Sequence, residues 1–459
     1  MTPGAHPIRE TLVRDRLIGR FSGRHDGPRL IVVGALHGNE PAGAIAARRV
    51  LSALEHADPD AIAGSLVALV GNLRACNDPN PDTRYIETDL NRAFTPHHLQ
   101  RAATLPDDDL GPEELELRDL TRLLDREITD RRTVLVDLHT TSAPSPPFIA
   151  MEDTLAARRV ARSLPLPIIL GLEEELPGLL FDYVTNHHRI VSFVVESGQH
   201  DDPESVTGHE AVIWTLLDAL GVLPIEGGPV AHQTDPRQVL RAAAGELGAR
   251  VFDVRHREAI IDEGYQTLEQ RGAFERVTRH RTPIAHQGGR TLTPPISGQL
   301  FMPNRQPIKQ LGDDAYFIVR ELSPGWLGLS ARLRRSRRLE RWIPRLLPGV
   351  RRRPGRPDEL LVAPDIAVVL KRQLLHLLGY RLIRRSHVLH LSRPARVWGA
   401  LRALVHAAFT LAGGAFRGGE RAALGAERDD DWVITRRTLD RDPPPDNPGT
   451  LGACNRRSD

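Results

Sequence analysis

Cysteine is nearly absent from this chain of 459 residues, which contains only Cys76 and Cys454. The two lie far apart and no C-x-x-C pair occurs, so a disulfide framework is not expected, and a zinc site built on thiolates is excluded by count. Scarce cysteine also favours a reducing compartment, and we therefore expect a cytoplasmic protein.

Long apolar runs are missing as well. The first 20 residues, MTPGAHPIRETLVRDRLIGR, contain no apolar run of about 7 to 15 residues, so no secretory signal is predicted. No segment reaches about 18 uncharged apolar residues, so no membrane span is expected. Aromatic residues make up only 5% of the chain, which leaves few rings for stacking on nucleic-acid bases.

The composition that remains is that of an ordinary globular protein whose charge is unevenly spread. Hydrophobic residues make up 40% and charged residues 26%, and the length corresponds to about two to four domains. From residue 331 onward, 27 arginines and lysines outnumber 13 acidic residues, a net charge of +14, so residues 1–330 carry −12 of the overall +2. This shift separates an acidic body from a basic tail.

Apolar runs alternate with helix-like segments in the first half of the chain. The runs that we interpret as buried strands are Arg29–Ala35, Ser65–Asn72, Thr133–His139, Pro167–Leu170 and Arg189–Glu196. The helix-like segments are Pro41–Leu54, Gly111–Ile128 and Val206–Gly221. Such alternation predicts an α/β fold, in which a mostly parallel or mixed sheet is flanked by helices, over residues 1–225.

Two further regions follow this domain. Residues 226–322 contain strand-like runs separated by GG, NR and GDD turns, which predicts a small β domain. Residues 323–459 are rich in arginine and proline, with helix candidates at 364–385 and 397–416, which predicts a basic helical extension that is disordered in part. Its charge suits contact with nucleic acid, an anionic lipid surface or an acidic partner, and packing on the acidic body is the alternative.

The first group of polar residues that points to chemistry is GALHGNE, directly after a predicted strand. His37 and Glu40 lie there, at the edge of the sheet where α/β proteins place their sites. Imidazole nitrogen and carboxylate oxygen are both good zinc ligands. On its own, His-x-x-Glu also fits the start of a helix.

A second histidine occupies an equivalent place in VLVDLHTTS. His139 ends an apolar strand, so it should reach the same edge of the sheet as His37. Asp137 points to the same side of that strand and is suited to orient a ligand. Three protein ligands would leave a fourth zinc position open, as in catalytic zinc sites.

Two more segments supply polar groups for the same edge. In FVVESGQ, Glu196 ends a third apolar strand and is a candidate general base, or else a salt-bridge partner. In TRYIETDLNRAF, Arg84, Asn91 and Arg92 share one polar loop. A guanidinium can hold a carboxylate or stabilise an oxyanion, although an exposed arginine loop is also ordinary in so arginine-rich a chain.

In their order along the chain, GALHGNEPAG, TRYIETDLNRAF, VLVDLHTTS and VVESGQ resemble the succinylglutamate desuccinylase and aspartoacylase family, relatives of the zinc carboxypeptidases. The likeness covers roughly Leu30 to Leu322. It implies a zinc carboxypeptidase-like fold and one Zn²⁺ per chain. The H-x-x-E pair is weakly specific, whereas four linked motifs in order are highly specific.

The resemblance also implies a role for each residue. His37, Glu40 and His139 would bind zinc, and Glu196 would activate water and then protonate the leaving amine. Arg84 would polarise the scissile carbonyl, and a substrate carboxylate would be held by Asn91 and Arg92. Family members that act on N-acetylaspartate have a further arginine about ten residues before the glutamate, where this chain has Asn186 followed by His187 and His188.

We therefore expect a zinc-dependent hydrolase that cuts the amide bond of an N-acyl amino acid or a similar small carboxylate-bearing amide. The alternatives are a zinc carboxypeptidase that acts on peptides, and a non-catalytic binding protein that acts through its basic tail. The sequence specifies neither the acyl group nor the oligomeric state.

Overall fold

A computed structural model describes residues 15–130, 132–269, 271–306 and 309–335, and four short segments of the tail, 350–353, 356–362, 376–384 and 432–436. The chain divides into two compact units. The described residues of the first unit lie within 15–152 and 156–322, and those of the second lie within 153–155 and 323–443.

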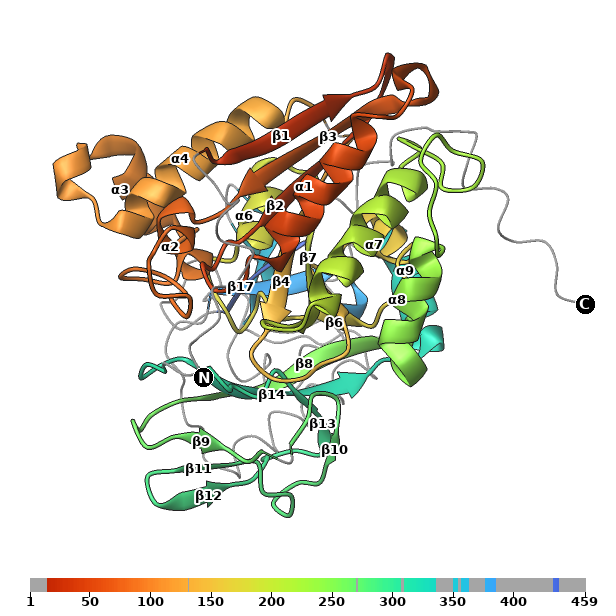
Figure 1. Ribbon diagram of the computed structural model, residues 1–459. Helices are drawn as coiled ribbons and strands as arrows, with labels where there is room; N and C mark the ends of the chain where they lie inside the picture. The colour runs from red at the N-terminus through yellow and green to blue at the C-terminus, as the bar shows by residue number, and fades with distance from the viewer. Residues whose placement is uncertain are drawn as a thin grey trace, which may run out of the picture. The chain divides into compact units, whose positions relative to one another are not determined.

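The first unit is built on an 11-stranded mixed sheet, in the order β1-β3-β2-β4-β7-β5-β6-β8-β14-β13-β10 (Figure 1). Strands β2, β3, β4 and β7 pair in parallel, whereas β5 runs antiparallel to β7. The strands are β1 (Leu17–Ser22), β2 (His25–Gly34), β3 (Ala63–Val70), β4 (Thr133–Thr141), β5 (Phe148–Met151), β6 (Ile168–Leu170), β7 (Val191–Gln199), β8 (Val251–Ala259), β10 (Arg276–Val277), β13 (Gly298–Phe301) and β14 (Asp314–Glu321).

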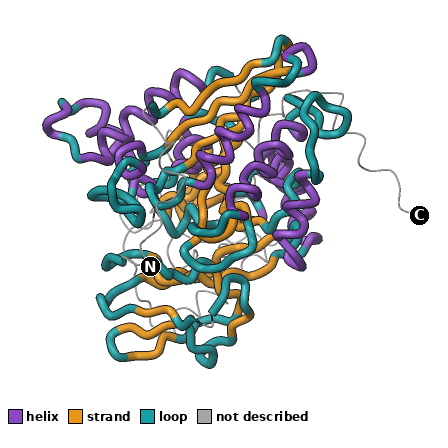
Figure 2. The backbone as a smooth tube through the Cα atoms, viewed as in Figure 1, coloured by secondary structure: helices purple, strands orange, loops and turns teal. Residues whose placement is uncertain are grey.

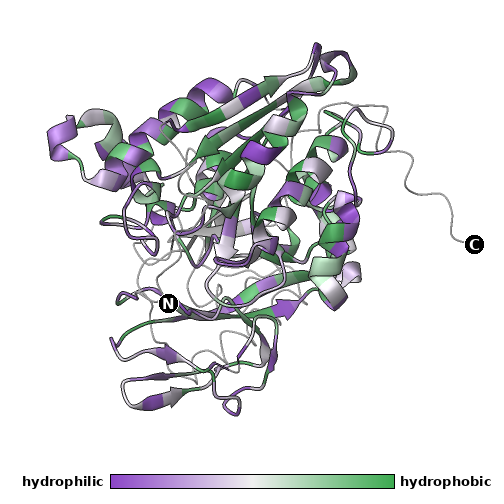
Figure 3. Ribbon diagram, viewed as in Figure 1, coloured by the Kyte–Doolittle hydropathy of each residue, from purple (hydrophilic) through white to green (hydrophobic). Residues whose placement is uncertain are grey.

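Helices cover the central strands of this sheet on both faces, because side chains alternate along each strand. In β2, Leu30 and Val32 pack in one apolar cluster with residues of α1 and α7, while Ile31 and Val33 pack in another with residues of α4 and α6. Figure 2 shows the strands of this sheet with helices beside them, and Figure 3 shows hydrophobic and hydrophilic residues alternating along the helices. The helices are α1 (Ala42–Leu54), α2 (Leu73–Cys76), α3 (Pro96–Thr104), α4 (Pro112–Glu127), α5 (Leu155–Ala161), α6 (Leu180–His187), α7 (Glu204–Ala219) and α8 (Pro236–Ala244).

The predicted α/β fold with a mixed sheet flanked by helices is confirmed. The five predicted strands overlap β2, β3, β4, β6 and β7, and the three predicted helices overlap α1, α4 and α7. The short strand β5 was not predicted, because its four residues carry no alternating pattern, yet it lies beside β7 in the sheet.

The predicted β region continues the main sheet. Strand β8 pairs with β6, and β14, β13 and β10 follow at the sheet edge. A separate three-stranded sheet contains β9 (Gln266–Thr267), β11 (Ala285–Gln287) and β12 (Arg290–Leu292). The predicted boundary near residue 225 therefore falls inside the first compact unit. The division of the chain into three domains remains a prediction.

The second unit has more strands than the predicted helical tail. Helix α9 (Pro324–Arg335) is followed by an antiparallel sheet in the order β15-β16-β18-β17. These strands are β15 (Val350–Arg353), β16 (Arg356–Val362), β17 (Tyr380–Arg384) and β18 (Trp432–Arg436). The prediction of a helix over 364–385 is wrong for residues 380–384, which form β17. Residues 364–375 of that predicted helix lie outside the described residues, as does the helix predicted over 397–416. Within the described part of the chain, no helix combines the length and the hydrophobicity needed to cross a membrane.

Candidate active site

The loop after β2 positions His37 and Glu40. Its backbone turns back at once, because the Glu40 N–H donates to the His37 carbonyl at 3.1 Å. Gly38 lies so close to another part of the chain that a Cβ there would be 2.4 Å from the Ala75 carbonyl oxygen. A larger residue at this position would displace the loop.

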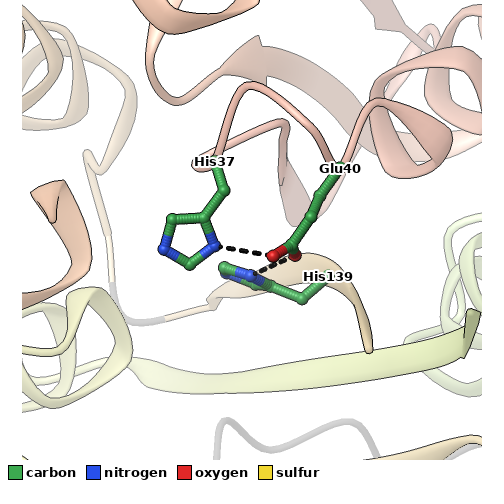
Figure 4. A group of neighbouring side chains, drawn as sticks. All are labelled: His37, Glu40 and His139. Carbon is green, nitrogen blue, oxygen red and sulfur yellow. Dashed lines mark hydrogen bonds and ion pairs between the residues drawn. The ribbon is translucent and has the colours of Figure 1, made fainter. Parts of the chain in front are cut away.

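His37, Glu40 and His139 converge at the edge where β2 and β4 end side by side (Figure 4). All three side chains are buried, and one potential ligand atom from each lies within 4.8 Å of the others. His37 Nδ1 lies 3.0 Å from Glu40 Oε1, and His139 Nδ1 lies 3.0 Å from Glu40 Oε2. The sequence-predicted ligand set is therefore brought together by the fold.

A carboxylate contacts the second nitrogen of each imidazole. His139 Nε2 lies 2.8 Å from Asp137 Oδ2, as predicted for an orienting residue, and His37 Nε2 lies 3.0 Å from Asp89 Oδ1. Such contacts fix the ring with Nδ1 directed towards Glu40, where a metal ion would bind. Asp89 was missed by the sequence analysis, although it lies in the same TDLNR segment as Asn91.

These residues fit a zinc ion by donor type and by spacing. Two imidazoles and a carboxylate form a common catalytic zinc set, and ligand atoms in tetrahedral zinc sites lie about 3.3 Å apart, given bonds of about 2.0 to 2.1 Å. Burial raises the pKa of Glu40, but the two histidines outweigh burial and hold that pKa well below its ordinary value. Burial lowers the pKa of His139, but Asp137 and Glu40 raise it further, to well above its ordinary value.

Glu196 lies one strand away from this group. Strand β7 pairs with β4 so that Glu196 is directly opposite His139. Its side chain is buried, and its Oε2 has no hydrogen-bond partner among the described residues. Burial is the main cause that raises the pKa of Glu196 to about 8, and the nearby charges of His139 and Arg84 oppose it. The unpartnered oxygen is available to a substrate or to water.

Arg84 is tied to the same group by its guanidinium. Nη1 donates to Glu40 Oε1 at 2.7 Å, and Nη2 donates to Asp89 Oδ2 at 3.5 Å. Burial lowers the pKa of Arg84, but the charges of Asp89, Glu40 and Glu196 outweigh burial and raise it. Arg84 therefore keeps its positive charge beside the candidate metal ligands.

Asn91 and Arg92 lie farther along the same loop. The Asn91 side-chain oxygen accepts from the Leu180 N–H at 3.0 Å, which leaves its amide hydrogens available. Arg92 Nη2 donates to Asp314 Oδ2 at 2.9 Å, so its charge already has a partner on β14.

One cavity of about 350 Å³ joins these groups. All seven sequence-predicted side chains line it: His37, Glu40, Arg84, Asn91, Arg92, His139 and Glu196. Its lining also includes Ala273, Met302, Gln306 and Phe317. The region after residue 226 therefore forms part of the same cavity as the candidate metal ligands.

His200 is a second residue that the sequence analysis missed. Gln306 Nε2 lies 3.1 Å from His200 Nε2 and can only donate, so a neutral His200 donates through Nδ1 to Thr140 Oγ1 at 2.8 Å. Burial is the main cause that lowers the pKa of His200, which favours this neutral form. The Thr140 N–H in turn donates to Glu40 Oε2 at 3.1 Å.

Asn186, His187 and His188 do not line the cavity. The Asn186 amide donates to Glu152 Oε1 at 2.7 Å. His187 and His188 form a separate, more exposed group of potential metal ligands with Asp125. Asn186, where the resemblance led us to look for a further arginine, therefore lies outside the lining of the cavity.

Comparison with known proteins gives the following matches. Residues 26–210 match the family model of the succinylglutamate desuccinylase/aspartoacylase catalytic domain. No curated protein matches the chain. A solved succinylglutamate desuccinylase/aspartoacylase from Rhodobacter sphaeroides is similar at 19% identity and a TM-score of 0.47, over 66% of this chain and 88% of that one. The succinylglutamate desuccinylase from Vibrio cholerae has 15% identity and a TM-score of 0.47, over 65% and 82%. The product-bound ectoine utilization protein EutE (DoeB) from Ruegeria pomeroyi has 15% identity and a TM-score of 0.46, over 65% and 87%.

Proposed function

Because residues 26–210 belong to the succinylglutamate desuccinylase/aspartoacylase catalytic-domain family, we propose that this protein is a zinc-dependent amidohydrolase. Its substrate is an N-acyl amino acid or a similar small carboxylate-bearing amide. The observation that carries the proposal is the buried convergence of His37, Glu40 and His139 on one edge of the sheet. The unpartnered carboxylate of Glu196 opposite His139 adds to it.

His37, Glu40 and His139 hold the metal in this proposal. A zinc ion at that point would lower the pKa of a water molecule to about 7 and polarise the amide carbonyl. Asp89 and Asp137 keep the two imidazoles in the ligand orientation through their Nε2 atoms.

Glu196 moves the proton. With a cation bound beside it, its carboxyl ionises at neutral pH, because a nearby positive charge favours the charged form. Its free Oε2 then accepts a proton from the attacking water and passes it to the leaving nitrogen. Burial keeps competing solvent away from this oxygen.

Arg84 and the loop that follows it bind the substrate. The Arg84 guanidinium stabilises the negative charge that develops on the carbonyl oxygen. Asn91 and Arg92 hold the substrate carboxylate: the Asn91 amide hydrogens are available to donate, and Arg92 shares its charge between that carboxylate and Asp314. The cavity wall of Ala273, Met302 and Gln306 favours small amides over peptides.

The test is hydrolysis of a panel of N-acyl amino acids and short peptides by the purified full chain, with and without a chelator. We expect chelator-sensitive cleavage of acyl amino acids, which zinc restores, and little cleavage of peptides. Faster cleavage of peptides would favour a carboxypeptidase instead. An absence of cleavage in zinc-loaded protein with every substrate would favour a binding protein that acts through its tail.

A further inference from the structure

The part of the cavity next to Glu196, which we call its floor, is lined by the apolar residues Val194, Phe148 and Ala150. On β7, Val194 lies two residues before Glu196, so both side chains point to the same face of the sheet. Strand β5 pairs with β7 so that Phe148 is opposite Glu196 and Ala150 is opposite Val194. Val194, Phe148 and Ala150 all line the cavity.

The wall above this floor is apolar too. Leu172, Leu176 and Leu179 lie between β6 and α6 and line the cavity, as does Phe317 of β14. They belong to the same apolar cluster as the floor residues. Leu172 keeps 6% and Leu176 keeps 4% of its surface exposed, so both still present atoms to the cavity.

The charges in the cavity are mostly negative. Among its described lining residues, two arginines, Arg84 and Arg92, face a larger set of carboxylates. These carboxylates belong to Glu40, Asp82, Asp89, Glu196, Asp313 and Asp314. Both guanidiniums already donate to carboxylates, and the six carboxylates exceed the two arginines even with the charge of a bound Zn²⁺ ion added. A second carboxylate on a substrate would therefore meet net negative charge and would compete for arginines that already have partners.

We infer that the substrate carries an uncharged, apolar group next to the scissile amide and no more than one carboxylate. This inference rests on the proposed function and names its substrate class. The apolar group fills the space bounded by Val194, Phe148 and Leu176, where each buried methylene group contributes about fourfold to binding. It belongs either to the acyl chain or to the side chain of the amino acid, since both flank the amide.

Four amides test the inference and separate these two sources. N-hexanoylglycine places the apolar group on the acyl side and N-acetylleucine places it on the amine side, whereas N-succinylglycine and N-acetylaspartate carry a second carboxylate at these positions. We expect kcat/KM of the zinc-loaded full chain to be at least about tenfold higher for one of the apolar pair than for either dicarboxylate. A higher value for a dicarboxylate would overturn the inference and leave the proposed hydrolysis intact.

Binding provides a second measurement that does not depend on turnover. Titration calorimetry of the four compounds against zinc-loaded Glu196→Gln protein should give tighter binding and a more negative heat-capacity change for the apolar compounds. If no compound is cut by the unmodified protein but this order of affinity holds, the proposed hydrolysis fails and the apolar site stands. Equal or tighter binding of the dicarboxylates removes the apolar site.

Two variants locate the apolar group. Leu176→Ala should lower kcat/KM for the preferred apolar amide about tenfold or more, and that for N-acetylglycine by a smaller factor, since three carbon atoms of the wall are lost. Leu176→Arg should shift the preference towards N-succinylglycine or N-acetylaspartate. Leu123→Ala removes the same atoms from a leucine that packs in a different apolar cluster and does not line the cavity, so it is the matched control. An unchanged apolar preference in Leu176→Ala, or an equal loss of preference in Leu123→Ala, would contradict this placement.

Discussion

The three candidate ligands and the candidate base lie on neighbouring parts of one sheet edge but are held in different ways. Both nitrogens of His37 and of His139 lie within hydrogen-bond distance of a carboxylate, and Glu40 also accepts from Arg84 and from the Thr140 N–H. Glu196, opposite His139, has an oxygen with no partner in the described part of the chain. Ligands must be fixed before the metal arrives, whereas a proton carrier must have an open atom. The difference in partners is what the two roles require.

Removing a ligand should have the largest effect. His37→Ala is expected to reduce bound zinc from one ion per chain to a small fraction and to abolish hydrolysis, because two remaining donors hold zinc weakly. Metal analysis of the purified protein measures it. His97→Ala, which changes an exposed histidine of α3 outside the cavity, should keep its zinc. Unchanged zinc content in His37→Ala would remove this residue from the ligand set.

Removing the open carboxylate should separate activity from metal content. Glu196→Gln keeps the shape of the side chain but cannot carry the proton, so we expect zinc content to be unchanged and kcat to fall about 10²- to 10⁴-fold. Glu210→Gln on α7 changes a carboxylate that pairs with Arg49 at the surface, and it should be fully active. An active Glu196→Gln enzyme would show that another group carries the proton.

Changing the carboxylates behind the histidines should weaken zinc binding without abolishing it. Asp89→Asn and Asp137→Asn each exchange an acceptor that fixes an imidazole for a weaker one, and we expect zinc affinity to fall about 10- to 100-fold. Competition with a chromogenic chelator measures the affinity of each variant. If both variants bind zinc as tightly as the unmodified chain, then the ring contacts at Nε2 do not prepare the site.

Local sequence patterns predicted the strand ends and the side chains at them. Apolar runs specify β2, β4 and β7, and parallel strands align their carboxyl ends, so His37, His139 and Glu196 could be placed on one edge in advance. The placement of each of these side chains could be predicted from residues within a few positions of its own strand.

The parts that could not be predicted depend on pairing between distant segments. Arg92 meets Asp314 across 222 positions, and His200 meets Gln306 across 106. The apolar cavity floor needs the short antiparallel strand β5, whose place beside β7 no local pattern specifies. Substrate preference depends on these contacts, which explains why the motifs indicated hydrolysis but not the group that is recognised.

The smallest predicted effect concerns the stability of the metal-free protein. Burial raises the pKa of Glu196 from 4.5 to about 8, so the folded protein holds a proton that the unfolded chain releases between these pH values. The contribution of the Glu196 carboxyl to the free energy of unfolding is fully present below pH 4.5 and is lost as the pH rises through 8. Glu196→Gln cannot ionise, so its unfolding temperature relative to the unmodified chain should increase from pH 5 to pH 8.5, by roughly 10 °C at about 1.4 kcal/mol per pKa unit and about 2 to 4 °C per kcal/mol.

Thermal unfolding in the presence of a chelator measures this difference at each pH. Added zinc should reduce it, because a cation beside the carboxylate favours the ionised form. A difference that stays constant across pH would mean that Glu196 is ionised in the empty site. The Glu196 carboxylate would then carry a negative charge that the neighbouring His139 and Arg84 stabilise. The residue that carries the proton would in that case be another one.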